Sequence, residues 1–275
     1  MTEMQPSDGK DTLFNLELAF NYSPAHVGFR GGLRPYLEYR DLGLAEASGG
    51  ILRAEHMRVK DRVGEIKSSW HVHKLDLQFI LILKGWVKIR NDSGFDGVLG
   101  PMTAGFQPAL YRHHEYAFSE DFEILEVTSP AVFETMPLDG VSAQLPHDGP
   151  KYPHAYYDVD RQEAWSQCSA PREGFLRREL GIGSLTSGKL DAHLIRAAPP
   201  QGFASQRNKH SVNHWLYVLG GEVHINMDRH GTFAMKEGDA ITIPAGAEYE
   251  ASGFSGDYLA LVVQVPANRY AEATT

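Results

Sequence analysis

The sequence contains a single cysteine, Cys168, among 275 residues. One thiol excludes an intrachain disulfide, a cysteine-based zinc knuckle and an iron–sulfur cluster. Its surroundings, WSQCSA, offer no partner that would activate the thiol as a nucleophile. Any metal site in this chain must therefore use other ligands.

Long hydrophobic runs and basic blocks are also missing. The longest aliphatic and aromatic run, residues 79–83, is far too short to cross a membrane, and the start MTEMQPSDGKD lacks the features of a secretory signal. With 26 Lys and Arg against 35 Asp and Glu, the net charge is −9, and no basic cluster offers a surface for phosphates. We therefore expect a soluble, cytoplasmic protein whose partners include neither nucleic acid nor a membrane.

Two segments of the chain resemble each other at a distance of 138 residues. Residues 41–58 read DLGLAEASGGILRAEHMR, and residues 179–196 read ELGIGSLTSGKLDAHLIR, with six identical pairs in an ungapped alignment. After a two-residue deletion, FILILKGWVKI (79–89) aligns with WLYVLGGEVHI (215–225) at offset 136. A repeat this long indicates a duplicated domain rather than a solenoid.

A proline-containing segment separates the two copies. The stretch ETMPLDGVSAQLPHDGPKYPHAYYDVD has four prolines, which disfavour regular structure. We predict an amino-terminal extension at residues 1–30, a first domain at 31–135, a linker at 136–156 and a second domain at 157–275.

Each copy consists of short runs rich in Val, Ile, Leu and aromatic residues. Glycine-containing turns separate the runs, and LKGW and LGGE are typical of tight hairpins. Long helical periodicity is missing, except near residues 11–20. Many short strands separated by turns indicate an all-β protein with a sandwich or barrel in each half.

The stretch WHVHKLDLQFILILKG (70–85) places His71 and His73 before an apolar strand. In an extended strand the side chains of i and i+2 share a face, so the two imidazoles point together. With 13 histidines in the chain, the pair alone is better explained by paired histidines on a half-exposed strand. Gln78 on the following strand and His113, at the start of another, favour a divalent-metal site that keeps positions open.

These residues resemble the first motif of the cupin family, G(X)5HXH(X)3-4E(X)6G. His71, His73 and Gly85 match it, and Gln78 stands where the family usually has Glu. The surrounding stretches also resemble a bacterial group of single-domain cupins. As a whole the chain resembles a bicupin, which implies two tandem cupin barrels of the jelly-roll, double-stranded β-helix type.

The second cupin motif, G(X)5PXG(X)2H(X)3N, is matched less completely. Pro108 and His113 fit, whereas Met102 and Leu110 occupy the positions of its two glycines. By resemblance, His71, His73, His113 and Gln78 are the expected metal ligands.

The carboxy-terminal half has the cupin frame VLGGEV and GDAITIPAG but not the ligands. The residues aligned with the four ligand positions of the first half are Arg207, Lys209, His214 and Tyr249. Two cations would repel a metal. A shifted alternative uses His210 and His214, with His193 or His224 nearby. We expect a degenerate, metal-free second cupin that contributes structure, dimer contacts or a pocket wall.

The ligands in the first half are all neutral, so a divalent ion there would keep its full charge and favour an anionic ligand. Imidazole suits Fe, Ni, Cu, Zn or Mn. Three-histidine cupin sites with open positions often belong to iron(II) dioxygenases, so the resemblance favours Fe(II) and oxidative cleavage of a small enolisable or phenolic substrate. A metal-dependent isomerase or lyase and a non-catalytic sensing bicupin are the alternatives. The family resemblance also implies a homodimer.

Four further residues are candidates for a substrate pocket. Trp70, Phe106 and Tyr111 could line it, although aromatic residues on barrel strands more often belong to the core. Glu115 shares the strand face of His113 and could support it. The sequence shows no nucleophile elbow, Walker loop or dinucleotide fingerprint, and no catalytic residue is assigned.

Overall fold

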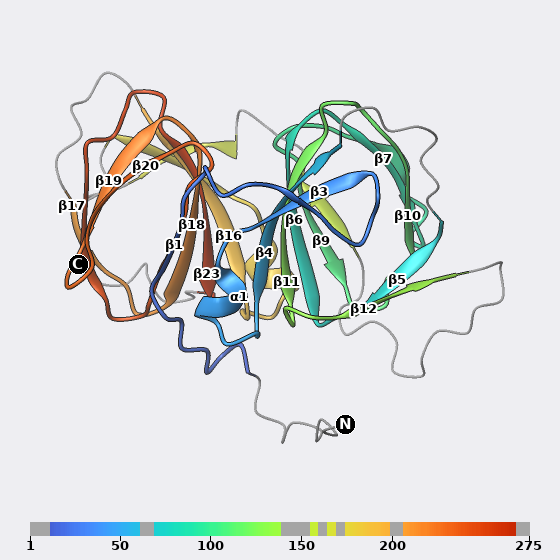
Figure 1. The fold of residues 1–275 in the computed structure, drawn as a ribbon, viewed down its shortest axis with the longest axis horizontal. Coiled ribbons are helices and arrows are strands. Elements are labelled where there is room, and N and C mark those ends of the chain that lie inside the picture. Colours follow the sequence, from blue (N-terminus) through green and yellow to red (C-terminus); the bar gives the residue numbers. More distant parts are fainter. Residues whose placement is uncertain are drawn as a thin grey trace.

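The computed structural model describes residues 12–60, 69–138, 155–158, 164–168, 174–198 and 206–267. The described strands form two barrels that lie side by side (Figure 1). Every pair of strands within them is antiparallel, as short strands joined by hairpins favour. The expected all-β architecture of two tandem jelly-roll barrels is confirmed.

The first barrel contains a seven-stranded and a five-stranded sheet. The larger sheet has the order β13 (Tyr156–Asp158), β9 (Ala104–Pro108), β6 (Leu77–Lys84), β11 (Glu123–Ser129), β4 (Arg53–Val59), β3 (Leu37–Asp41) and β2 (Arg30–Gly31). The smaller has the order β12 (Glu134–Pro137), β5 (His71–Lys74), β10 (His113–Phe118), β7 (Val87–Asn91) and β8 (Asp96–Leu99).

The second barrel repeats this arrangement. Its larger sheet has the order β1 (Asn21–Ser23), β21 (Ala240–Ile243), β18 (Asn213–Gly220), β23 (Leu259–Val265), β16 (Asp191–Ala197), β15 (Phe175–Glu179) and β14 (Ser166–Gln167). Its four-stranded sheet is β17 (Gln206–Lys209), β22 (Glu248–Ser252), β19 (Glu222–Met227) and β20 (Gly231–Lys236). The short helices α1 (Leu44–Ala47) and α2 (Ile182–Leu185) follow equivalent strands, β3 and β15.

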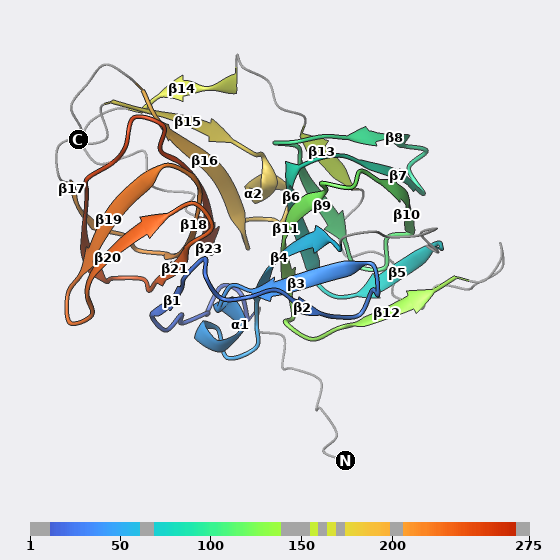
Figure 2. The ribbon, with the colours of Figure 1, turned by 45° about the horizontal axis from the view of Figure 1, so that its top comes forward.

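The two barrels exchange edge strands. β1, from the segment before the first domain, pairs with β21 of the second barrel, and β13, from the end of the predicted linker, pairs with β9 of the first. Figure 2 shows each of these strands beside its partner. The barrels therefore do not coincide with two contiguous stretches of chain. Most of the predicted linker, including the domain boundary that we expect near residue 150, lies outside the described residues.

The largest hydrophobic cluster lies between the two seven-stranded sheets and contains residues of both barrels, among them Phe79, Leu125, Trp215 and Val263. Residues 12–20 contain no helix, contrary to the periodicity there. Leu13, Leu16 and Leu18 instead pack irregularly into this cluster, so tertiary packing rather than a helix face explains their spacing.

Two buried arginines cross this interface in opposite directions. Arg40 on β3 donates from Nη2 to the carbonyl oxygen of Gly238 at 2.7 Å. Arg178 on β15 donates from Nη1 to the carbonyl oxygen of Met102 at 3.4 Å and from Nη2 to the Asp158 carboxylate at 2.9 Å. Arg40 and Arg178 are equivalent in the sequence repeat, and so are Gly238 and Met102. Each barrel therefore holds the corresponding turn of the other.

The backbone keeps the glycine conformation where motif glycines are missing. Met102 and Leu110 have φ values of 62° and 58°, and their counterparts Gly238 and Gly246 have 90° and 77°. A left-handed conformation costs a residue with a Cβ about 1 to 2 kcal/mol. The turn geometry thus persists although the sequence motif is degraded.

The predicted hairpin turns are confirmed. Gly85 lies between β6 and β7 with φ of 65°, and Gly221 lies between β18 and β19 with φ of 69°. A Cβ on Gly85 would come within 2.9 Å of the Cα of Phe122, so the turn requires glycine. No helix among the described residues is long and apolar enough to span a membrane.

Candidate metal centre

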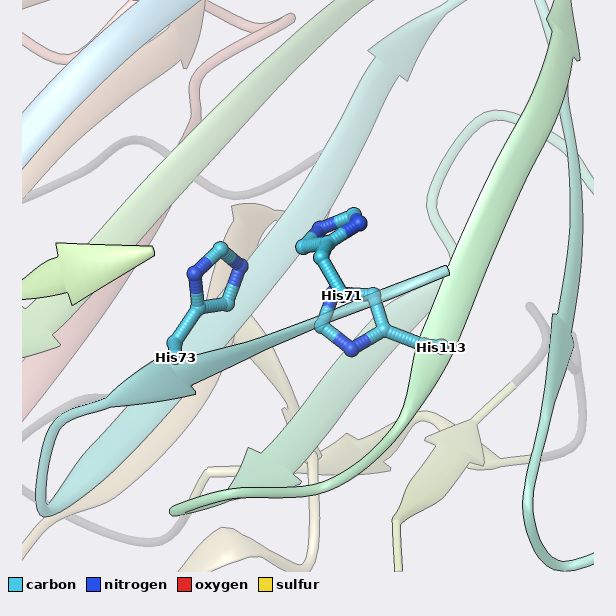
Figure 3. Close-up of side chains that lie close together, drawn as sticks. All are labelled: His71, His73 and His113. Carbon is cyan, nitrogen blue, oxygen red and sulfur yellow. The ribbon is translucent and has the colours of Figure 1, made fainter. Parts of the chain in front are cut away.

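Three histidines converge inside the first barrel. His71 on β5 is the register partner of His113 on β10, and His73 projects from the same face of β5. The ring centroids of His71 and His113 are 4.3 Å apart, and that of His73 lies 5.0 Å from each. One nitrogen from each ring lies within 4.8 Å of the other two. Figure 3 shows the three rings facing a common point.

Hydrogen bonds fix the orientation of these rings. Nδ1 of His71 donates to the carbonyl oxygen of Ser69 at 2.9 Å, and Nδ1 of His113 donates to that of Tyr111 at 2.8 Å. Nδ1 of His73 lies 2.9 Å from the hydroxyl oxygen of Thr135. With Nδ1 occupied on each ring, the Nε2 lone pairs are directed toward the shared space, as in metal-binding histidines.

The surroundings keep two of the rings neutral. Burial lowers the pKa of His113 to about 4 and that of His73 well below its usual value. Nε2 of His113 is buried and makes no hydrogen bond in the structure. Neutral imidazoles, one of them with an unpaired Nε2, fit a transition metal, so the donor set suits the ion that the resemblance implies.

Gln78 on β6 lines the same cavity as His73. Its Nε2 donates to Oε2 of Glu126 at 2.5 Å, and Glu126 is paired with Arg53 at 3.3 Å. Its Oε1 is buried and has no hydrogen-bond partner. The amide nitrogen is thus engaged by Glu126, and the amide oxygen is available as a metal ligand.

Glu115 brings a negative charge that the expected all-neutral ligand set lacks. Its Oε1 lies 3.4 Å from Nε2 of His113, and its Oε2 lies 3.6 Å from Nε2 of His71. Burial alone would raise its pKa, but the guanidinium of Arg34 holds that pKa well below the usual range. Because residues i and i+2 of β10 share a face, this carboxylate lies beside two imidazoles, in addition to the neutral ligands that the sequence predicts.

Arg34 completes the group, and sequence analysis missed it. It lies in the loop between β2 and β3, with Nη1 3.4 Å from Oε2 of Glu115 and Nη2 3.0 Å from Nε2 of His71. A metal at Nε2 of His71 would take the lone pair that Arg34 contacts, so the guanidinium would have to turn away. No local pattern marks a loop arginine more than thirty residues before the motif.

A cavity of about 340 Å³ adjoins His73. Its polar lining includes His73, Gln78, Gln107, Glu115 and Arg34, and apolar side chains form much of the rest. The volume lies within the range of small-molecule sites.

Three of the four predicted pocket residues lie elsewhere. Phe106 packs between the barrels, because strand alternation turns Gln107, not Phe106, toward the cavity. Trp70 lies against His114 on the far side of β5, and Tyr111 contributes its carbonyl oxygen to His113. Only Glu115 lines the cavity, so the predicted pocket role of the three aromatic residues is not supported there.

The equivalent region of the second barrel is built differently. Nζ of Lys209 pairs with Glu248 at 2.9 Å on the exposed surface. The rings of His210 and His214 stack at 4.0 Å, and Nε2 of His210 lies 2.9 Å from the hydroxyl of Tyr249. Among the residues that the structure describes, only His71, His73 and His113 form a group able to hold a metal. His193 is buried in β16 and His224 is exposed on β19.

Comparisons with known proteins agree with this architecture. Residues 195–259, in the second barrel, match the family described as Cupin domain. The protein Ylba from E. coli aligns with a TM-score of 0.59 and 14% identity over 92% of this chain and 93% of its own. An oxalate decarboxylase aligns with a TM-score of 0.63 and 15% identity over 90% of this chain and 77% of its own. A mutant of the Bacillus subtilis enzyme aligns with a TM-score of 0.62 and 15% identity over 90% of this chain and 78% of its own. No curated protein sequence matches the chain.

Proposed function

We propose that this chain, whose fold and domain match support the cupin superfamily, is a metal-dependent enzyme with its centre in the first barrel. The observation that carries the proposal is the convergence of three ring nitrogens, each within 4.8 Å of the others, beside a cavity. His71, His73 and His113 would hold one divalent transition metal. Oε1 of Gln78 and the carboxylate of Glu115 are available as further ligands.

Such an ion would supply a Lewis acid and, for a redox-active metal, electrons for oxygen chemistry. We favour Fe(II), which the family resemblance implies. Mn(II), which is named for the centres of Bacillus subtilis oxalate decarboxylase, is the main competitor, and Ni, Zn or Cu would also accept imidazole.

The residues around the centre favour an anionic substrate. With neutral imidazoles, the single carboxylate of Glu115 is balanced by Arg34, so the charge of the ion would be largely uncompensated. Arg34 can rotate from His71 toward an anion because its other contact, with Glu115, is a single hydrogen bond at 3.4 Å. Arg34 would orient the substrate, and Glu115 would restrain Arg34.

The finer proposal is a dioxygenase that acts on a small enolisable or phenolic compound. Supporting it are three convergent imidazoles and the cavity that His73 helps to line. The repeated strand order and the reciprocal arginines further support a bicupin that arose by duplication. The homodimer remains a prediction.

The test is oxygen uptake by protein reconstituted anaerobically with Fe(II) or Mn(II), with catechol and acetylacetone as phenolic and enolisable probes. We expect uptake that requires metal and probe, is lost in His73→Ala and is retained in Lys209→Ala, the matched change in the second barrel. Turnover without oxygen consumption would replace the dioxygenase by an isomerase or lyase. Bound metal with no turnover of any probe would favour a binding protein.

A further inference from the structure

The cavity beside the three histidines changes character along the barrel axis. On β10 the register runs from His113, opposite Asn91, through Glu115, opposite Ile89, to Phe118, opposite Val87. At about 3.3 Å per residue, Phe118 lies some 16 Å along the strand from His113. One end of the cavity is thus polar, and the other is apolar.

The opposite wall follows the same gradient. Gln78 on β6 is level with Gln107 on β9, and two residues further Ile80 faces the cavity. Ile124 on β11, which pairs with Met57 on β4, continues the apolar wall. The charged side chains of this wall contact one another, since Arg53 lies 3.3 Å from both Glu55 and Glu126.

The apolar end is closed by buried side chains. Val87, Leu99 and Phe122 are each 3% exposed, and Ile89 is 2% exposed, yet all four line the cavity. They belong to one hydrophobic cluster of the first barrel, separate from the core between the barrels. Water in such a space finds few hydrogen-bond partners, so an apolar group is the favoured occupant.

We infer that the substrate is amphiphilic, with an anionic chelating head at the histidines and an aliphatic or aromatic tail among Val87, Ile89, Leu99 and Phe122. The inference rests on the proposed metal centre, because the head requires the ion. A compact polar dianion would leave the apolar end unfilled. The substrate class is therefore a hydrophobic carboxylic, enolic or phenolic acid.

The experiment measures binding of alkyl hydroxamates, from acetohydroxamate to octanohydroxamate, to Mn(II)-loaded protein by calorimetry, with metal content determined in parallel. We expect affinity to rise about three- to fourfold per methylene, the equivalent of about 0.8 kcal/mol, until the cavity is full. Oxalate, which has no tail, should bind more weakly than octanohydroxamate.

Two valine substitutions separate the tail site from the fold. Val87→Phe fills the apolar end and should weaken octanohydroxamate at least tenfold while leaving metal content and acetohydroxamate binding unchanged. Val98→Phe, the control, adds the same volume on the outside of β8, where Val98 is 58% exposed, and should change neither. Ile89→Ala enlarges the same end and should raise the longest chain accommodated, which keeps the test valid if Val87→Phe does not fold.

The outcomes distinguish the two proposals. Protein that binds metal and acetohydroxamate but shows no dependence on chain length would overturn the amphiphilic substrate and leave the metal centre intact. Protein that binds no metal would overturn both.

Discussion

The two barrels share one strand order and enclose different interiors. The first surrounds a cavity of about 340 Å³ beside three imidazoles, and the second a cavity of about 60 Å³ lined mainly by apolar and aromatic side chains. The larger sheets and the crossing arginines are nevertheless equivalent. The barrel frame is therefore set by turns, sheet faces and the interface, whereas a few inward positions determine whether a site exists.

Those positions explain the smaller cavity. The residue equivalent to His113 is Tyr249, whose hydroxyl meets His210, and His210 stacks on His214, the equivalent of Gln78. In the second barrel these rings contact one another, whereas the three imidazoles of the first barrel face a shared space. The second interior is filled by its own side chains.

The substitution expected to have the largest effect is His113→Tyr, which gives the first barrel the residue found at the equivalent position of the second. We expect metal affinity to fall about a thousandfold, or about 4 kcal/mol, because loss of an inner ligand exceeds the 10- to 100-fold effect of an outer partner. Competition with a fluorescent chelator measures it. Unchanged affinity would show that His113 is not a ligand.

The interface arginines should differ in their effect on stability. Arg178→Met removes the partner of the Asp158 carboxylate at 2.9 Å and should lower the free energy of unfolding by about 3 kcal/mol. Arg40→Met leaves a carbonyl oxygen unpaired and should cost about 1 to 2 kcal/mol. Urea unfolding gives both values, and the reverse order would contradict the roles assigned to these residues.

A carboxylate near the interface should make stability depend on pH. The hydrogen bond from His56 at 2.8 Å and the nearby Lys84 lower the pKa of Glu123 to about 2. Because the folded pKa lies below the ordinary value near 4.3, the stabilisation is present above about pH 4.3 and is lost as the pH falls toward 2.

Glu123→Gln should therefore lower the free energy of unfolding above pH 5, by no more than about 1 kcal/mol in a partly exposed pair, and with it the melting temperature. The difference should shrink toward pH 3. Melting curves of both proteins across this range provide the measurement. A difference that grows as the pH falls would reverse the assigned sign.

The smallest effect is expected at Met102, which has the left-handed conformation that Gly238 adopts in the second barrel. Met102→Gly relieves this strain but loses apolar contact with the interface cluster, so the net change should not exceed about 1 kcal/mol. Gly238→Ala should be destabilising, because the new Cβ would meet that of Ala25 at 3.0 Å. Denaturation of the two variants compares them directly.

The fold could be predicted from the sequence because its determinants are local and repeated. Hairpin glycines such as Gly85 and alternating apolar strands occur in both halves. The exchange of β1 and β13 could not be predicted, since a strand of three residues carries no signal of which barrel it joins.

The site was predictable to the extent that it depends on strand alternation. The convergence of His71 and His73 and the placement of Glu115 follow from residues two apart on one strand. Phe106 was misassigned because its face depends on which side of the larger sheet meets the other barrel. Arg34 reaches the centre from a loop, and no periodicity determines where a loop side chain ends.

The most direct test of the central claim is metal content by elemental analysis in three proteins: wild type, His71→Ala/His73→Ala, and Arg207→Ala/Lys209→Ala at the equivalent positions of the second barrel. The account predicts about one transition metal per chain in the wild type and the second variant, and none in the folded first variant. Equal metal in all three proteins, or none in the wild type, would contradict a metal centre confined to the first barrel.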